Sequence, residues 1–297
     1  MEPRSPDADQ LSAATGHGRI AALATEGHRD LLKCAKRYPD LFPQAPFHPT
    51  VFSGTALATA FGAPWLTADQ LRMANRTALW IFAADWQVDY MAKSREEIAA
   101  IRRQCLTTAD GAAPPHGSSL SQFLYEIQQD LNATTAFSSL RSVWRAELKR
   151  TLDSYVREWE WKAERSSLPT FADYMDNADN IGSSFVNISH WIAHGNSSTL
   201  RCLEDLTMAS RQVQRVLRLL NDLATYQRDL TWNDLNALML GVNRTDVHQH
   251  IAQLTFNVKS LLEPLKSVCP QEVMYLERQI GFSTGFYGVT DYWGTLR

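Results

Sequence analysis

Apolar residues recur at the spacing of an α-helix through five long segments, and this periodicity constrains the fold more than any other feature. The clearest segment is 71–91, where apolar residues fall at i, i+3, i+4 and i+7. The same spacing runs through 140–164, 210–230, 247–265 and 270–280. Signals for strands are scarce, and only 14 Gly and 12 Pro interrupt the 297 residues. The sequence therefore predicts an all-α fold, a bundle of about ten helices or more.

Local signals mark where some of these helices begin. Thr67 and Gln70 have the spacing of a capping box, which predicts a helix that starts directly after Thr67. The pair Pro169-Thr170 predicts another helix start, after a break at 165–168. These signals divide the periodic segments into separate helices of ordinary length.

The composition narrows the class of protein. We expect residues 1–15 to be disordered and residues 16–297 to form a single domain, because no repeat or shift in composition marks another boundary. A net charge of −3 gives no electrostatic reason to bind nucleic acid or an anionic membrane. The four cysteines lie far apart, which argues against a disulfide framework or a zinc site. With no secretory signal and no apolar run of about 18 residues, the protein is expected to be cytoplasmic.

Two aspartates follow an apolar and aromatic helical segment. Asp85 and Asp89 stand at i and i+4, so a helix projects both carboxylates from one face. We call them the aspartate pair. Such a pair is either an ordinary solvent-exposed helix end or a set of oxygen ligands for a hard cation such as Mg²⁺.

A second polar stripe begins after another very apolar segment. Asn221, Thr225 and Asp229 fall at i, i+4 and i+8, which places one oxygen-bearing side chain on each turn of a single face. We call them the Asn–Thr–Asp stripe. Amide, hydroxyl and carboxylate oxygens form a weak Mg²⁺ site that phosphate oxygens would complete, and the adjacent Arg228 would reach the same anion. The alternative is a polar stripe that faces solvent.

Together, these two sets of residues resemble the metal-binding motifs of the class I terpene synthases. In that family an aspartate-rich motif and an NSE/DTE motif lie on opposite walls of an all-α barrel. The aspartate pair matches the first and last acids of the DDxxD motif, with Trp86 in place of the second aspartate. The Asn–Thr–Asp stripe matches NDxxSxxxE, with the shorter Asp229 in place of the glutamate. Arg228 takes the place of the basic residue beside the final acid.

A third segment is similar to one particular branch of that family. Trp161 and the run PTFADYMDNA at 169–178 resemble the "W…(V/L)PTFEEYMxNA" segment of plant kaurene-synthase-like enzymes. The run DLNALML at 234–240 resembles their "KLNAVSL". Many other terpene synthases carry a diphosphate-sensing arginine near the position of 174–177, and an Arg-Tyr pair near the C-terminus. Neither is found in this chain.

The resemblance implies a bacterial-type, single-domain class I diterpene synthase of the labdane-related group, with residues 16–297 as its α domain. Its cofactor would be Mg²⁺, three ions held by the aspartate pair and the Asn–Thr–Asp stripe, with Arg228 drawing charge onto the leaving diphosphate. The substrate would be ent-copalyl diphosphate and the product an ent-kaurane-type diterpene, kaurene or kauranol. Because a class II DxDD motif is absent, a separate class II diterpene cyclase would supply that substrate. A homodimer is left open.

Aromatic residues near the motifs suit a pocket that stabilises carbocations through cation–π attraction. The alternative for each is a place in the ordinary core. Gly182 is expected to break a helix and to aim a backbone carbonyl into the pocket. The residues expected to contact substrate are Trp80, Phe82, Trp86, Asn177, Phe185, Tyr287, Tyr292 and Trp293.

Three other functions compete with this interpretation. A cyclase of linear geranylgeranyl or farnesyl diphosphate would use the same motifs. A prenyl-chain elongating synthase would normally carry two DDxxD motifs, which disfavours it here. A non-catalytic helical interaction domain would leave both sets of polar residues in solvent.

Overall fold

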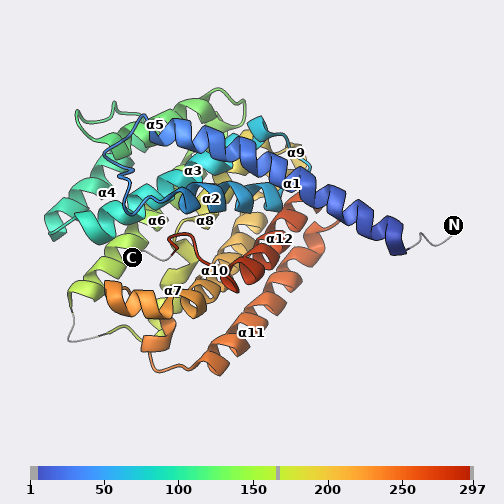
Figure 1. Ribbon diagram of the computed structural model, residues 1–297. Coiled ribbons are helices and arrows are strands. Elements are labelled where there is room, and N and C mark those ends of the chain that lie inside the picture. Colours follow the sequence, from blue (N-terminus) through green and yellow to red (C-terminus); the bar gives the residue numbers. More distant parts are fainter. Residues whose placement is uncertain (1–5, 165–167, 295–297) are drawn as a thin grey trace.

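The computed structural model describes residues 6–164 and 168–294, and within these ranges it consists of helices joined by loops, with no β-strand (Figure 1). The prediction of an all-α fold is confirmed. The α-helices are α1 (Pro6–Ala35), α2 (Pro49–Gly62), α3 (Ala68–Trp86), α4 (Arg95–Ala109), α5 (Ser119–Asn132), α6 (Phe137–Ala163), α7 (Phe171–Asn177), α8 (Ser183–His194), α9 (Ser197–Arg201), α10 (Leu203–Trp232), α11 (Arg244–Leu262) and α12 (Pro270–Tyr287).

Four short helical turns of other types complete the description. The π-helix η1 (Gln87–Met91) continues α3 without a break. The 3₁₀ turns are η2 (Ala178–Asn180), η3 (Ala237–Met239) and η4 (Glu263–Leu265). π-Helical turns frequently mark functional sites, and this one, which ends α3, carries half of the aspartate pair.

The helix starts that the sequence predicts are present. Thr67 accepts a bond from the backbone N–H of Gln70 at 3.3 Å, and the Gln70 side chain accepts one from the Thr67 N–H at 2.9 Å. This reciprocal capping box starts α3. Thr170 caps α7 in the same way with Asp173. The break expected at 165–168 falls mostly on residues 165–167, which lie outside the described residues.

The amino-terminal end differs from the expectation. Helix α1 begins at Pro6, so residues 6–15 are helical, although we expected disorder through residue 15. The reason is local: a proline is tolerated in the first turn, and the alanines and Leu11 that follow are strong helix formers. The first turns of α1 extend beyond the other helices (Figure 1).

Large aromatic side chains hold together the helices that carry the site. The Phe185 ring on α8 packs against Trp80 of α3 at 5.8 Å and against Trp144 of α6 at 5.3 Å, and all three are fully buried. Burying each such side chain contributes about 1.5–3 kcal/mol. Among the described residues, no helix is both long enough and apolar enough to span a membrane.

Candidate active site

A cavity of about 300 Å³ opens between α3 and α10, and α2, α6, α8 and α12 close its other sides. Its volume lies at the lower end of the range for small-molecule sites, about 300–1,000 Å³. The cavity brings together Asp85, Asp89, Asn221 and Asp229 from segments more than 100 residues apart. The other charged side chains that line it are Glu158, Lys162, Arg218, Arg228 and Asp234.

The aspartate pair spans the junction between α3 and η1. Asp85 lies in the last turn of α3, and Asp89 lies in the π-helix, where the N–H of Ala92 bonds to the carbonyl of Gln87. Both carboxylates line the cavity. Burial, followed by the charge of Asp89, raises the pKa of Asp85 well above its usual range. Burial also raises the pKa of Asp89 to about 7, although the Lys162 ammonium opposes this shift.

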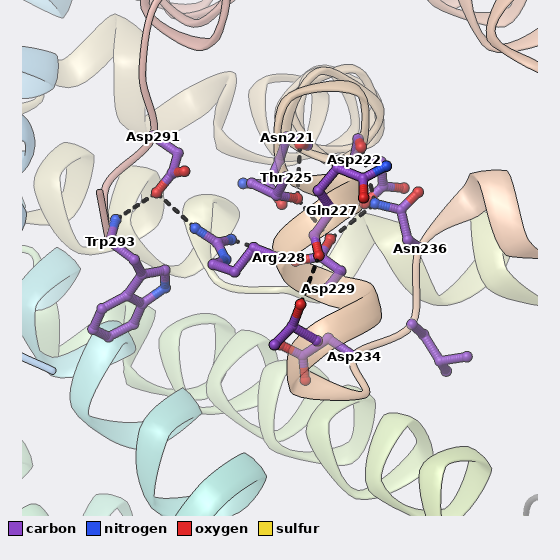
Figure 2. Close-up of polar contacts among 12 residues, drawn as sticks. Asn221, Asp222, Thr225, Gln227, Arg228, Asp229, Asp234, Asn236, Asp291 and Trp293 are labelled. Atoms are coloured by element: carbon purple, nitrogen blue, oxygen red, sulfur yellow. Dashed lines mark hydrogen bonds and ion pairs between the residues drawn. The ribbon is translucent and has the colours of Figure 1, made fainter. Parts of the chain in front are cut away.

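The Asn–Thr–Asp stripe lies on α10 and is held by hydrogen bonds (Figure 2). The Thr225 hydroxyl lies 2.6 Å from Oδ2 of Asp229 and 3.0 Å from the carbonyl of Asn221. The Asn236 side-chain amide donates to the same Asp229 Oδ2 at 2.8 Å. Burial raises the pKa of Asp229, and these two hydrogen bonds oppose that shift. Asn221 and Asp229 line the cavity directly, whereas Thr225 is buried beside them.

Arg228 connects the stripe to the carboxyl-terminal segment. Its Nη1 donates to Oδ1 of Asp291 at 2.6 Å, and its Nη2 lies 3.5 Å from Oδ1 of Asp229 (Figure 2). Asp291 also accepts bonds from the backbone N–H groups of Trp293 at 2.7 Å and Gly294 at 2.9 Å. The charge of Arg228 thereby fixes the segment that places Trp293 on the cavity wall.

A buried network that the sequence did not reveal lies behind the stripe. Arg218, one turn before Asn221, donates to Glu158 at 3.2 Å and to the carbonyl of Leu235 at 3.2 Å. Its guanidinium also bonds to the Tyr174 hydroxyl and lies 4.8 Å from the centre of that ring. Segment 174–177 has no arginine of its own, but Arg218 reaches it from α10. No local pattern predicts a contact between residues 44 positions apart.

Asp222 completes this network and is another residue that the motif pattern alone did not assign. Its carboxylate accepts bonds from the Tyr174 hydroxyl at 2.8 Å and from the backbone N–H of Ala237 at 3.1 Å. Burial raises its pKa to about 6, although the Arg218 charge opposes this shift. Asp222 thus joins α7 and η3 to the back of the helix that carries the stripe.

Four of the eight predicted substrate contacts line the cavity: Phe82, Tyr287, Tyr292 and Trp293. The Phe82 ring lies 5.3 Å from Tyr292 and 5.6 Å from Trp293, which makes one continuous aromatic surface. The first pair is tilted and the second is edge-to-face, and the face of an aromatic ring attracts cations. This surface is the apolar counterpart of the charged end of the cavity.

The other four predicted contacts do not line the cavity, and each has a structural role instead. Trp80 and Phe185 lie in the core, where the Trp80 indole donates to the carbonyl of Leu120 at 3.0 Å. Trp86 stacks on Tyr90 at 4.4 Å. Asn177 is buried behind the wall and donates to Ser154 and Glu158. Helix rotation explains Trp80 and Phe185, because Phe82 and Ser183 line the cavity and residues two positions apart point about 200° apart around the axis.

The predicted helix break at Gly182 is present, with a positive φ of 120°. A Cβ there would come within 2.6 Å of the Ile81 side chain, so the position requires glycine. The Gly182 carbonyl accepts the first backbone bond of α8, from Val186 at 3.1 Å. The carbonyl is therefore engaged in the helix, which differs from the expected orientation into the pocket.

The donor set fits a hard divalent cation. Among the described residues, no three His, Cys, Asp or Glu side chains converge to form a complete site on their own. Instead, two carboxylates stand on one wall, and an amide and a carboxylate stand on the other, with the Thr225 hydroxyl buried beside them. All five side chains carry oxygen, and burial raises the pKa of the three carboxyl groups. Ions shared with phosphate oxygens would complete both sets.

Fold and site together define a class of enzyme. Residues 76–252 match the family described as terpene synthase family 2, C-terminal metal binding, which is more than half of the chain. The chain belongs to this family and is a class I terpene synthase.

Individual relatives are distant. The chain is 23% identical over 277 residues to ent-pimara-9(11),15-diene synthase of Streptomyces sp. (strain KO-3988), which covers 90% of this chain and 92% of the relative. Linalool/nerolidol synthase from Streptomyces clavuligerus has a similar fold at 14% identity, with a TM-score of 0.64 over 91% of this chain and 93% of the other. 2-Methylisoborneol synthase from Streptomyces coelicolor is 16% identical, with a TM-score of 0.66 over 92% of this chain and 91% of the other.

Proposed function

We propose that this enzyme ionises ent-copalyl diphosphate in a Mg²⁺-dependent reaction and cyclises it to an ent-kaurane-type tetracyclic diterpene, kaurene or kauranol. The observation that carries the proposal is the cavity itself. Oxygen ligands converge on it from α3–η1 and from α10, and an aromatic surface lines its other part. This arrangement suits a substrate with a diphosphate head and a hydrocarbon body.

The metal ligands of the proposal are the aspartate pair and the Asn–Thr–Asp stripe, which would hold three Mg²⁺ ions. When bound, these ions would neutralise the leaving diphosphate as its carbon–oxygen bond breaks. Two fold relatives support the head-group assignment, because their structures contain 2-fluorogeranyl diphosphate, in one case together with Mg²⁺.

The protein's own side chains do the remaining work. Arg228 stands beside Asp229 and donates charged hydrogen bonds, which stabilise the diphosphate as negative charge develops on it. The faces of Phe82, Tyr292 and Trp293 stabilise the carbocation that remains. The apolar walls restrict the access of water to this cation until a proton is lost or one water adds.

The bicyclic substrate is the most specific part of the proposal. It rests on the kaurene-synthase-like segment at 169–178 and on the distant relative whose name gives an ent-configured diene. A class II diterpene cyclase would supply it, in the cytoplasm. A homodimer is compatible with the same chemistry.

Product analysis tests the proposal. Purified protein is incubated with Mg²⁺ and, separately, with ent-copalyl, geranylgeranyl and farnesyl diphosphates. We expect a tetracyclic hydrocarbon or alcohol from ent-copalyl diphosphate alone. A product from a linear substrate only would keep the class of enzyme and overturn the substrate. The same incubation with EDTA should release no diphosphate.

A further inference from the structure

Lys162 is a largely buried cation at the charged end of the cavity, and no motif assigns it a role. It lies in the last turn of α6, and only 12% of its side chain is exposed. Its Nζ donates to Oδ1 of Asp234 at 2.8 Å and stands 3.5 Å from Oδ2 of Asp89. Its ammonium also lies 5.2 Å from the centre of the Tyr90 ring. Lys162 therefore contacts the aspartate pair from a third wall of the cavity.

The three cations that line the cavity differ in how fully they are engaged. Arg218 uses its guanidinium on Glu158, Tyr174 and a backbone carbonyl. Arg228 donates a hydrogen bond to Asp291 and lies 3.5 Å from Asp229, and its buried Nε has no partner among the described residues. An ammonium has three N–H donors, and among the described residues the one hydrogen bond of Lys162 is to Asp234. Lys162 thus retains donor capacity at the cavity surface.

The environment of Lys162 also holds it in place. Asp234 bonds to Lys162 with one oxygen and to the Tyr90 hydroxyl with the other. When Asp89 binds a divalent cation, its ion pair with Lys162 weakens because the carboxylate charge is then neutralised. Asp234 still retains the ammonium at the same wall. A phosphate oxygen is the natural acceptor for the donors that remain.

We propose that Lys162 is a diphosphate-binding residue of this enzyme and that Asp234 positions it. This inference rests on the proposed function, since it assumes a diphosphate next to the aspartate pair. Lys162 would bind the head group from α6, between the ligands on α3–η1 and those on α10. It supplies a fixed positive charge beside Asp89 and Asp234.

The test is calorimetric titration of the full-length protein with inorganic diphosphate in the presence of Mg²⁺. We expect Lys162→Gln to weaken binding by about tenfold or more, the loss of a charge-assisted hydrogen bond. Lys162→Arg, which keeps the charge, should retain most of the affinity. Lys149→Gln is the matched control, because it removes an exposed lysine of the same helix and should bind like the unchanged protein.

A double variant separates binding from structure. If Lys162 only neutralised Asp234, the variant Lys162→Gln/Asp234→Asn would recover the affinity lost in Lys162→Gln, and this result would overturn the assignment. We expect the double variant to bind as weakly as Lys162→Gln alone, with an unfolding temperature close to that of the unchanged protein. Equal affinities of Lys162→Gln and the unchanged protein would also overturn it.

The unchanged protein and Asp85→Ala test the premise separately. Mg²⁺-dependent diphosphate binding that is lost in Asp85→Ala supports the proposed function, whatever Lys162→Gln does. If the unchanged protein does not bind diphosphate with Mg²⁺, the proposed function fails and the role of Lys162 fails with it.

Discussion

The two polar walls of the cavity are built in opposite ways. On α10, Asp229 accepts hydrogen bonds from Thr225 and Asn236, both neutral donors, before any ligand is present. On α3–η1, no described residue donates a hydrogen bond to Asp85 or Asp89, and the nearest cation is Lys162 at 3.5 Å from Asp89. One wall is preorganised by its own contacts, whereas the other holds two close carboxylates with little compensation.

Because of this difference, the two walls should contribute differently to folding stability although both take part in turnover. A carboxylate that accepts hydrogen bonds from buried donors contributes to folding, because its removal leaves those donors unpaired. Two buried carboxylates without donors oppose folding, and a bound cation relieves that cost. We therefore expect substitutions on the two walls to have the same effect on turnover and opposite effects on stability.

The largest expected effect is on turnover, and it is common to both walls. Asp85→Ala and Asp229→Ala should each lower the rate of diphosphate release by about 10³-fold or more, because each removes a ligand of ions worth several kcal/mol to the leaving group. Asp69→Asn is the matched control for α3, since this exposed acid lies on the same helix. Unchanged turnover in Asp85→Ala would show that the aspartate pair does not bind metal.

The stabilisation of the protein by bound Mg²⁺ and diphosphate should depend on both walls. Mg²⁺ with inorganic diphosphate at about 100 times its dissociation constant should stabilise the protein by about 2.7 kcal/mol. EDTA should remove this gain, and so should Asp85→Asn or Asp229→Asn, measured by thermal unfolding. If a variant of one wall keeps the full gain in stability, the carboxylate that it lacks does not bind the metal ions.

The next effect distinguishes the α10 wall. Asp229→Ala should destabilise the metal-free protein by about 1–3 kcal/mol, because the Asn236 amide keeps only its bond to the Asp222 carbonyl and the Thr225 hydroxyl only its bond to the Asn221 carbonyl. Chemical denaturation measures this loss. Asp205→Ala removes an exposed acid from the first turn of the same helix and should cost at most about 0.3–1 kcal/mol, the contribution of such an acid at a helix start. Equal stabilities of Asp229→Ala and the unchanged protein would refute the claim that this wall is preorganised.

The smallest effect distinguishes the aspartate pair. Asp85→Asn should stabilise the metal-free protein by about 1 kcal/mol, since it removes one of two buried acids that repel each other. The same denaturation experiment, performed in EDTA, measures this gain. A loss of stability as large as that of Asp229→Ala would eliminate the contrast between the walls.

Local patterns in the sequence predicted the helices and the residues that share a face. The capping box at Thr67 and the spacing of the Asn–Thr–Asp stripe depend only on neighbouring residues, so they are visible without a structure. The π-turn at Gln87–Met91 has no such signal and was not predicted. Phe82 lines the cavity and Trp80 lies in the core, because packing decides which face of α3 meets the cavity.

Long-range charge pairs account for most of what the sequence did not reveal. Lys162 pairs with Asp234 across 72 positions, and Arg228 with Asp291 across 63. These pairings depend on how α6, α10 and the carboxyl-terminal segment meet, and no periodicity in one chain encodes that. The motif resemblance pointed to the oxygen-bearing residues of both walls and to Arg228, but not to Lys162 or Arg218.

The most direct test of the account is a crystal structure of the protein with Mg²⁺ and inorganic diphosphate. We expect the metal ions to lie between the two walls, with the aspartate pair on one side, the Asn–Thr–Asp stripe on the other, and the diphosphate shared between them. Diphosphate bound elsewhere, or metal bound by one wall alone, would contradict the claim that both walls form one site.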